Sequence, residues 1–156
     1  MASSPRSKPR LRALPRTRTS ITCRSATGFT NIEVAEGVYS HQTALSFFEL
    51  SDLNPARLHL TVPTRFRRNS AIPGILVLHF VNLVDADIQS AQGLSVTRPL
   101  RTIVDLAETD SIERGFLRQA IQQALQRGLI TGSEMKRAKL TAPIQRVFDQ
   151  ALKQVA

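Results

Sequence analysis

The spacing of apolar residues differs between the middle of this chain and its C-terminal part, and that difference constrains the fold more than any other feature of the sequence. In RLHLTVP (57–63) apolar and polar residues alternate, which is the pattern of a strand with one buried face. From Thr97 onward apolar residues recur every three or four positions, the period of amphipathic helices. Strands followed by helices predict an α+β fold, with a small β-sheet around residues 57–80 and a helical C-terminal segment.

Two strands are expected in this sheet. One face of the first carries Leu58, Leu60 and Val62. Its other face carries His59 and Thr61, while GILVLHF (74–80) is apolar on both faces, which is typical of an inner strand. His59 and His79 could then lie on paired strands, so a metal pair is one interpretation. Because no third ligand stands at a useful spacing, half-buried sheet histidines are the favoured one, and no cofactor is expected.

A short helix is predicted to begin at Ser40, whose hydroxyl can accept a hydrogen bond from a free backbone N–H in the first turn. Behind it, apolar residues recur at helical spacing at Ala44, Leu45 and Phe48. Thr43 is expected to face water. Asn54 precedes Pro55, which pushes it out of helical geometry and ends the helix. The later segment 82–96 is polar and is expected to be irregular.

The densest local signal is VTRPLRTIVDLAE (96–108), which predicts the next helix. Thr97 is expected to cap it, and Pro99 falls in its first turn, where a missing N–H costs nothing. Arg101 and Asp105 are four residues apart, so they can pair on the helix surface. Such a pair contributes little when exposed. When it is buried, it would hold two segments in register, and losing one partner would be strongly destabilising.

Three further helices are predicted toward the C-terminus. The residues expected to begin them are Asp110, Thr131 and Thr141. Gly128 is expected to end the first of the three. Glu134 completes a capping box at the start of the second, which should run through Leu140, and Pro143 lies in the first turn of the third.

The net charge of +9 belongs to the beginning of the chain. Residues 1–32 hold seven basic side chains and no acid, which leaves 14 of the 21 basic residues against 12 acidic ones elsewhere, a net of +2. Prolines forbid a long helix in the basic segment, and no apolar period runs through it. We therefore expect a disordered basic arm over residues 1–36 and one α+β domain over residues 37–156.

Three roles for this arm are open. It is an extension or start-site artefact without a role, an arm that binds phosphate backbones by counterion release, or a transit peptide. The candidate contacts to DNA or RNA are Arg6, Lys8, Arg10, Arg12, Arg16 and Arg18.

Other classes of protein are disfavoured by what the sequence contains. Its single cysteine, Cys23, rules out an internal disulfide and fits a reducing compartment. The apolar run 71–84 is too short and too interrupted to span a membrane, so a cytoplasmic location is expected. No glycine-rich phosphate loop, paired-cysteine site or HExxH motif occurs. Ser40 and His41 are chain neighbours and cannot supply a nucleophile–base geometry, so no enzymatic activity is predicted.

Four segments between Gly37 and about Ile130 resemble the AbiEi-type antitoxins of bacterial type IV toxin–antitoxin systems. They are GVYSHQTAL (37–45), RLHLTVP (57–63), PGILVLHF (73–80) and GLSVTRPLRTIVDLAE (93–108). The candidate motif residues are Tyr39, Ser40, His41, Thr43, His59, Thr97, Pro99, Arg101, Thr102 and Asp105. A glutamate is more usual in this family where Gln42 stands. His41 is expected to be a structural residue of a first helical turn, bonded to nearby backbone or to the Arg101–Asp105 helix, with a binding role as the alternative.

The resemblance implies a two-part antitoxin of a phage abortive-infection system. In such proteins an N-terminal winged helix binds the operon's own promoter, and a C-terminal domain counteracts a nucleotidyltransferase-like toxin without needing direct contact. Residues 37–156 would be the neutralising domain. Residues 1–36 offer no three-helix winged helix, so sequence-specific DNA binding is not expected from them. A related family with the landmarks SHxTAL and TxPxRTxxDL continues into a nuclease-like domain, and this chain ends before one. The alternatives are a nucleic-acid-binding protein acting through the arm and a truncated remnant.

Overall fold

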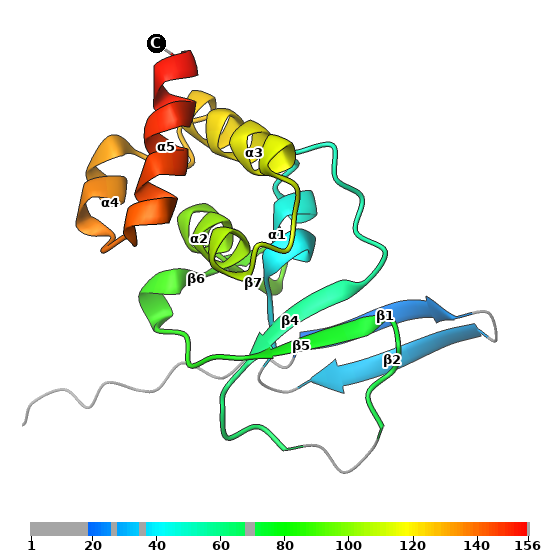
Figure 1. The fold of residues 1–156 in the computed structure, drawn as a ribbon. Helices are drawn as coiled ribbons and strands as arrows, with labels where there is room; N and C mark the ends of the chain where they lie inside the picture. Colours follow the sequence, from blue (N-terminus) through cyan, green and yellow to red (C-terminus); the bar gives the residue numbers. More distant parts are fainter. Residues whose placement is uncertain (1–18, 26–27, 35–36, 68–70, 156) are drawn as a thin grey trace, which may run out of the picture.

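The computed structural model describes residues 19–25, 28–34, 37–67 and 71–155. Over these residues the chain forms a five-stranded mixed sheet together with five α-helices, so the predicted α+β class is confirmed. Figure 1 shows most of the helices gathered on one side of the molecule and the strands β4 and β5 on the other.

The five-stranded sheet is larger than the one predicted. Its strands are β3 (Val38–Tyr39), β4 (Leu58–Val62), β5 (Leu76–Phe80), β6 (Ile88–Ala91) and β7 (Leu94–Thr97). They lie in the order β5-β4-β3-β7-β6; β4 pairs with β5 and β3 with β7 in parallel, and the other two pairs are antiparallel. The expectation that 74–80 forms an inner strand is wrong, because β5 lies at the edge of the sheet.

The segment 82–96, expected to be irregular, instead contains a 3₁₀ turn, η1 (Asp85–Asp87), and the hairpin of β6 and β7. Gln92 and Gly93 join the two strands with φ values of 52° and 78°. Two-residue hairpin loops favour positive φ at both positions, because that twist matches the twist of the flanking strands. A glycine at the second turn position was the local signal for this hairpin.

The helices are α1 (His41–Phe47), α2 (Pro99–Thr109), α3 (Arg114–Gln126), α4 (Gly132–Arg137) and α5 (Ala142–Val155). The helix α1 ends well before Asn54 and Pro55. Its chain reverses at Glu49, which has a positive φ of 52° and donates its backbone N–H to the carbonyl of Ser46. The predicted terminator therefore lies in a loop beyond the helix.

Two of the three predicted starts among the later helices are correct. Thr131 and Glu134 form the expected capping box, although α4 ends at Arg137 and not at Leu140. Thr141 immediately precedes α5. Asp110 does not begin a helix. It is the left-handed residue, with φ of 46°, that ends α2, and α3 begins at Arg114.

Two apolar clusters hold the fold together. The helical core is formed by buried residues of all five helices, with Leu45, Ile103, Leu106, Ile121 and Phe148 among its fully buried members. The sheet core is Tyr39, Ala44, Leu60, Val62, Leu76 and Val96. Neighbouring residues of α1, Ala44 and Leu45, belong one to each cluster, so this short helix joins the sheet to the helices.

The structure differs from the prediction of a disordered arm over part of residues 1–36. The strands β1 (Thr19–Ser25) and β2 (Gly28–Val34) pair antiparallel, from Thr19 opposite Val34 to Ser25 opposite Gly28. Threonine and isoleucine occur in both strands and valine in β2, and these residues favour extended backbone. The six candidate nucleic-acid contacts of the arm lie outside the described residues. Within the described ranges, no helix is both long enough and apolar enough to cross a membrane.

Candidate functional site

Three histidines from three different segments lie in one stack on one face of the strands β4 and β5. The rings of His41 and His79 are nearly parallel, with centroids 3.6 Å apart and an interplanar angle of 11°. The His59 and His79 centroids are 5.2 Å apart, and His59 Nδ1 lies 3.0 Å from His79 Nε2. In the parallel register of β4 and β5, Thr61 lies opposite His79, which places His59 and His79 on the same face. We call His41, His59 and His79 the histidine stack.

The chain between β3 and α1 positions His41. Its φ of 50° is left-handed, a conformation that few residues other than glycine adopt. On one side of it, the Ser40 N–H donates to the carbonyl of His59 at 3.0 Å, which extends the β3–β4 ladder. On the other, Thr43 Oγ1 accepts the His59 N–H at 2.7 Å. Thr43 was expected to face water; it is half-buried, and its hydroxyl takes a place in the sheet's hydrogen bonding.

Ser40 occupies the N-cap position, but its hydroxyl makes no cap bond to the helix, so that part of the prediction is wrong. It accepts a hydrogen bond from Thr61 Oγ1 at 2.8 Å and lies 3.0 Å from His41 Nδ1. Since the Ser40 hydroxyl accepts from Thr61, its own hydrogen is free to donate to Nδ1 of a neutral imidazole. His41 is therefore bonded to Ser40, rather than to backbone or to the Arg101–Asp105 helix as expected. The expectation that these chain neighbours cannot pair as a hydroxyl and a base is also wrong, because the left-handed backbone at His41 brings the ring back to the Ser40 hydroxyl.

Burial keeps the stack uncharged at neutral pH. Burial first, then the neighbouring His79, His59 and Arg101 charges, lowers the pKa of His41 from 6.5 to about 3. Burial together with His79 and Arg57 lowers the pKa of His59 to about 4, and burial lowers the pKa of His79 as well. Neutral imidazole is also the metal-binding form of histidine. Yet no three histidine, cysteine or acidic side chains among the described residues are placed to hold a metal ion.

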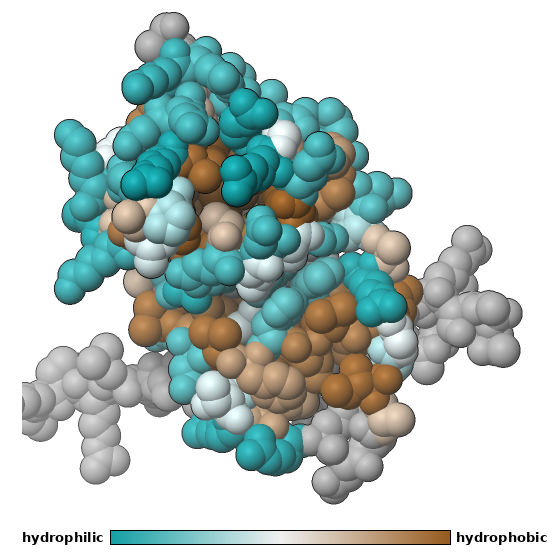
Figure 2. Space-filling model, in the orientation of Figure 1, coloured by the Kyte–Doolittle hydropathy of each residue, from teal (hydrophilic) through white to brown (hydrophobic). Residues whose placement is uncertain are grey.

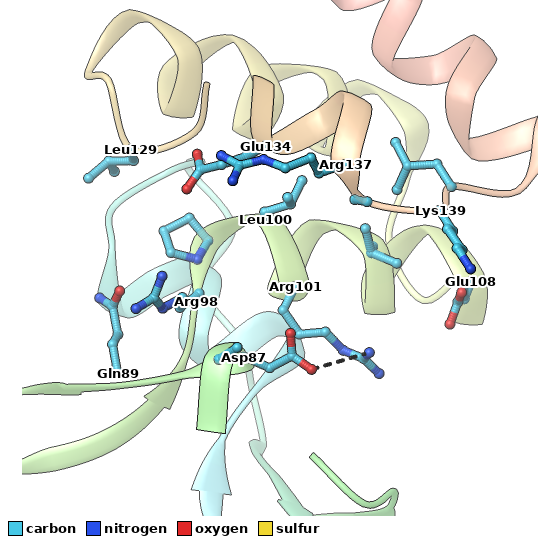
Figure 3. Close-up of a pocket in the computed structure, with 15 residues that line it drawn as sticks. Asp87, Gln89, Arg98, Leu100, Arg101, Glu108, Leu129, Glu134, Arg137 and Lys139 are labelled. Carbon is cyan, nitrogen blue, oxygen red and sulfur yellow. Dashed lines mark ion pairs between the residues drawn. The ribbon is translucent and has the colours of Figure 1, made fainter. Parts of the chain in front are cut away.

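The segment 93–108, which contains most of α2, supplies a cluster of ion pairs. Arg101 Nη2 lies 2.8 Å from Asp105 Oδ1, so the predicted i, i+4 pair is formed, with the Asp105 side chain only 8% exposed. Arg101 Nη1 also lies 3.7 Å from Asp87 Oδ2, a contact that ties α2 to the turn η1 and that spacing along one helix does not predict (Figure 3). Burial raises the pKa of Asp105, while the hydrogen bond and charge of Arg101 oppose that shift.

The remaining motif residues fix how α2 leaves the sheet. Thr97 and Thr102 are fully buried, and their hydroxyl oxygens lie 2.7 Å apart. Thr97 ends β7 and is not the cap of α2, which is Arg98, whereas Pro99 lies in the first turn as predicted. Tyr39 packs in the sheet core. Tyr39, Thr97, Pro99 and Thr102 therefore have structural roles. His41, His59, Arg101 and Asp105 are the motif residues that form the candidate functional site.

A pocket of about 620 Å³ opens on the other side of Arg101, between α2, the turn η1 and α4. Figure 3 shows Arg98, Arg101, Arg137 and Lys139 around it together with Asp87, Glu108 and Glu134. Its charges are mixed. Sequence reasoning missed this pocket because its lining comes from segments up to about fifty residues apart, each unremarkable by itself. It also missed Thr61 and Asp87. The favoured interpretation of His59 and His79 as half-buried sheet histidines is confirmed, but the contact of His79 with His41 was not predicted.

A scan against known protein families finds no match for this chain, and a search of curated proteins finds none either.

Proposed function

We propose that this chain is the neutralising component of a type IV toxin–antitoxin pair, a cytoplasmic, regulator-like protein that counteracts a nucleotidyltransferase-like toxin without a catalytic step of its own. The four segments that resemble AbiEi-type antitoxins supply β3, α1, β4, β5, β7 and α2. Together they contain four of the five strands of the sheet and most of the helices α1 and α2.

The meeting of these four segments at one place is the observation that carries the proposal. His41, His59 and His79 come from the first, second and third segments and stack on one another. Arg101 comes from the fourth, and its charge acts on His41. A chance resemblance of four short motifs gives no reason for their polar residues to share a site.

The hydroxyl groups at the site favour a structural and binding role over chemistry. Ser40 is fully buried and Thr61 is 2% exposed, and the two bond to each other. A nucleophile has to reach its substrate, and these oxygens have no access to one. The carboxylate of Asp105 is held by Arg101.

A growth-rescue assay tests the proposal. The full chain and residues 37–156 are each expressed with the toxin from the adjacent gene, and we expect both to restore colony formation. Arg101→Ala should lose rescue, whereas Arg118→Ala, which removes an exposed arginine from α3, should keep it. Circular dichroism confirms that each variant is folded. Failure of folded wild-type chain to rescue contradicts the proposal and leaves a remnant or another function.

A second candidate is favoured by the charge of residues 1–32, which hold seven basic side chains and no acid. An arm that binds nucleic acid releases counterions, so its affinity for DNA or RNA should fall steeply with salt and vanish when residues 1–32 are deleted. Binding that ignores salt or survives the deletion contradicts this candidate.

A further inference from the structure

One edge of the sheet carries most of the exposed apolar surface. Among the described residues six large apolar side chains are exposed, and five of them lie between residues 72 and 84, namely Ile72, Ile75, Phe80, Val81 and Val84. Phe80 is 49% exposed and Val84 60%. No charged residue occurs from 71 to 84. Figure 2 shows brown side chains gathered over the region where Figure 1 places β4 and β5. Contiguous apolar patches of this kind mark interaction surfaces.

The backbone of β5 is also open along this edge. Leu58 N donates to Ile75 O at 2.8 Å and Val81 N to Val62 O at 3.0 Å, so the odd-numbered residues of this strand bond to β4. Backbone groups alternate in direction along a strand, which turns the N–H and C=O of Leu78 and Phe80 outward. No described strand pairs with this outer edge. Natural edges are blunted by lysine or proline, and β5 itself contains neither.

We infer that β5 pairs with the β5 of a second copy of this chain, antiparallel and about a twofold axis through Leu78. In that register Leu78 lies opposite Leu78 of the second copy, and Leu76 lies opposite Phe80. The outward N–H and C=O of Leu78 and the outward N–H of Phe80 then find partners, whereas the Leu76 N–H stays bonded to the carbonyl of Pro73. The two five-stranded sheets become one continuous sheet. The twofold pairing is isologous, since each copy contributes the same residues.

The lack of charge on segment 71–84 favours a second copy of the chain over a nucleic acid or an acidic protein as its partner. Most of the net charge of +9 lies in residues 1–32, whereas segment 71–84 contains no Lys, Arg, Asp or Glu, so two copies can meet at this segment without like-charge repulsion. A nucleic acid or an acidic protein would need lysine or arginine side chains on this strand, and it has neither. The opposite edge, β6, is a poor alternative, because Asp87 and Arg98 flank its hairpin and its residues include Gln89 and Ser90.

Sedimentation of the full chain over concentrations up to about 100 µM tests the association. We expect a species of twice the monomer mass that persists as salt is raised, because the contact is apolar. Phe80→Lys should weaken the dimer at least about tenfold. Leu152→Lys is the matched control, since Leu152 is 37% exposed on α5, away from this edge, and its replacement should leave the dimer unchanged.

Disulfide trapping tests the register. In a Cys23→Ser background, Leu78→Cys places one thiol opposite its own copy at a Cα separation of about 5.5 Å, which is within disulfide range. Mild oxidation should therefore cross-link Leu78→Cys and leave Leu152→Cys monomeric. The inference is overturned if the folded wild type stays monomeric, if its dimer survives Phe80→Lys, or if both cysteine variants cross-link equally. These results do not depend on the toxin, so they are separate from the rescue assay.

Discussion

The helical half of the molecule (α3, α4 and α5) and the sheet half (β3 to β7 with α1 and α2) follow different rules. In the described part of the chain all six buried polar side chains belong to the sheet half: Ser40, His41, Thr61, Thr97, Thr102 and Asp105. Five of the six exposed large apolar side chains also belong to it. The helical half keeps apolar groups inside, with Leu152 as its single exposed large apolar side chain among these residues.

This difference indicates that the two halves of the molecule have different roles. Burying polar groups is unfavourable unless each is bonded, so a chain selected for stability alone would fill such positions with apolar residues. Local rules of folding are broken mostly where a site is built. We therefore assign stability chiefly to the helical half and interaction to the sheet half.

The largest effect is expected from opening a cavity in the helical core. Phe148 is fully buried, so Phe148→Ala should lower the free energy of unfolding by about 3–5 kcal/mol. The exposed Leu152 serves as its control on the same helix, and Leu152→Ala should change stability by less than about 1 kcal/mol. Urea unfolding followed by circular dichroism measures both. Similar losses in the two variants would mean that α5 is not part of a cooperative core.

The next effect belongs to the sheet half and depends on pH. The folded pKa values of His41 and His59, about 3 and about 4, lie below the unfolded value of 6.5. The unfolded chain therefore binds more protons in this range, and the free energy of unfolding should fall as pH is lowered from neutral toward 4. The loss should be on the order of 2–4 kcal/mol, after discounting for the partly exposed ring of His59. The pKa of Asp105 is raised in the folded state, so protonation of this carboxyl should recover a small part of the lost free energy of unfolding at the acidic end of this pH range.

A substitution at His41 sharpens this test. Asparagine tolerates the left-handed backbone found there, so His41→Asn changes the imidazole with little added backbone strain. Urea unfolding at several pH values should give a clearly shallower pH dependence than the wild type. An unchanged slope would show that the buried histidine is not the group responsible.

The two halves also differ in how far the sequence could predict them. The capping box of Thr131 and Glu134 and the start of α5 after Thr141 are local signals, and both predictions are confirmed. Such signals need only the few residues around a helix end. The error at Asp110, where the two halves join, was also local, since that residue ends α2 instead of beginning α3.

Predictions failed in the sheet half where distant partners decide the outcome. Ser40 lies at the expected N-cap position, yet its hydroxyl bonds to Thr61, twenty-one residues away. The strand β5 is apolar on both faces, which suggested an inner strand, but strand order is set by pairing that spacing does not encode. The paired strands of His59 and His79 were foreseen, whereas His41 joins them only through the left-handed turn before α1.

The ion pair on α2 offers a smaller, matched comparison between the halves. Asp105→Asn should reduce the free energy of unfolding by about 1–3 kcal/mol, because it removes the charge that holds the partly buried Arg101. Asp149→Asn makes the same chemical change at an exposed position of α5 and should cost less than about 0.5 kcal/mol. Thermal unfolding at neutral pH compares the two variants. Equal effects would remove the distinction drawn here between buried and exposed carboxylates.

The smallest effect tests whether α4 opens locally while the rest of the helical half stays folded. The side chain of Thr131 accepts the Glu134 N–H at 3.3 Å, and Glu134 Oε2 accepts the Thr131 N–H at 2.9 Å. Thr131→Ala should therefore cost about 1 kcal/mol, with Ser133→Ala as the nearby control. Because α4 is only six residues long, much of this loss should appear as local opening, measured as faster amide exchange at Glu134 with Phe148 unaffected. Equal acceleration at both sites would instead make α4 part of the cooperative helical core.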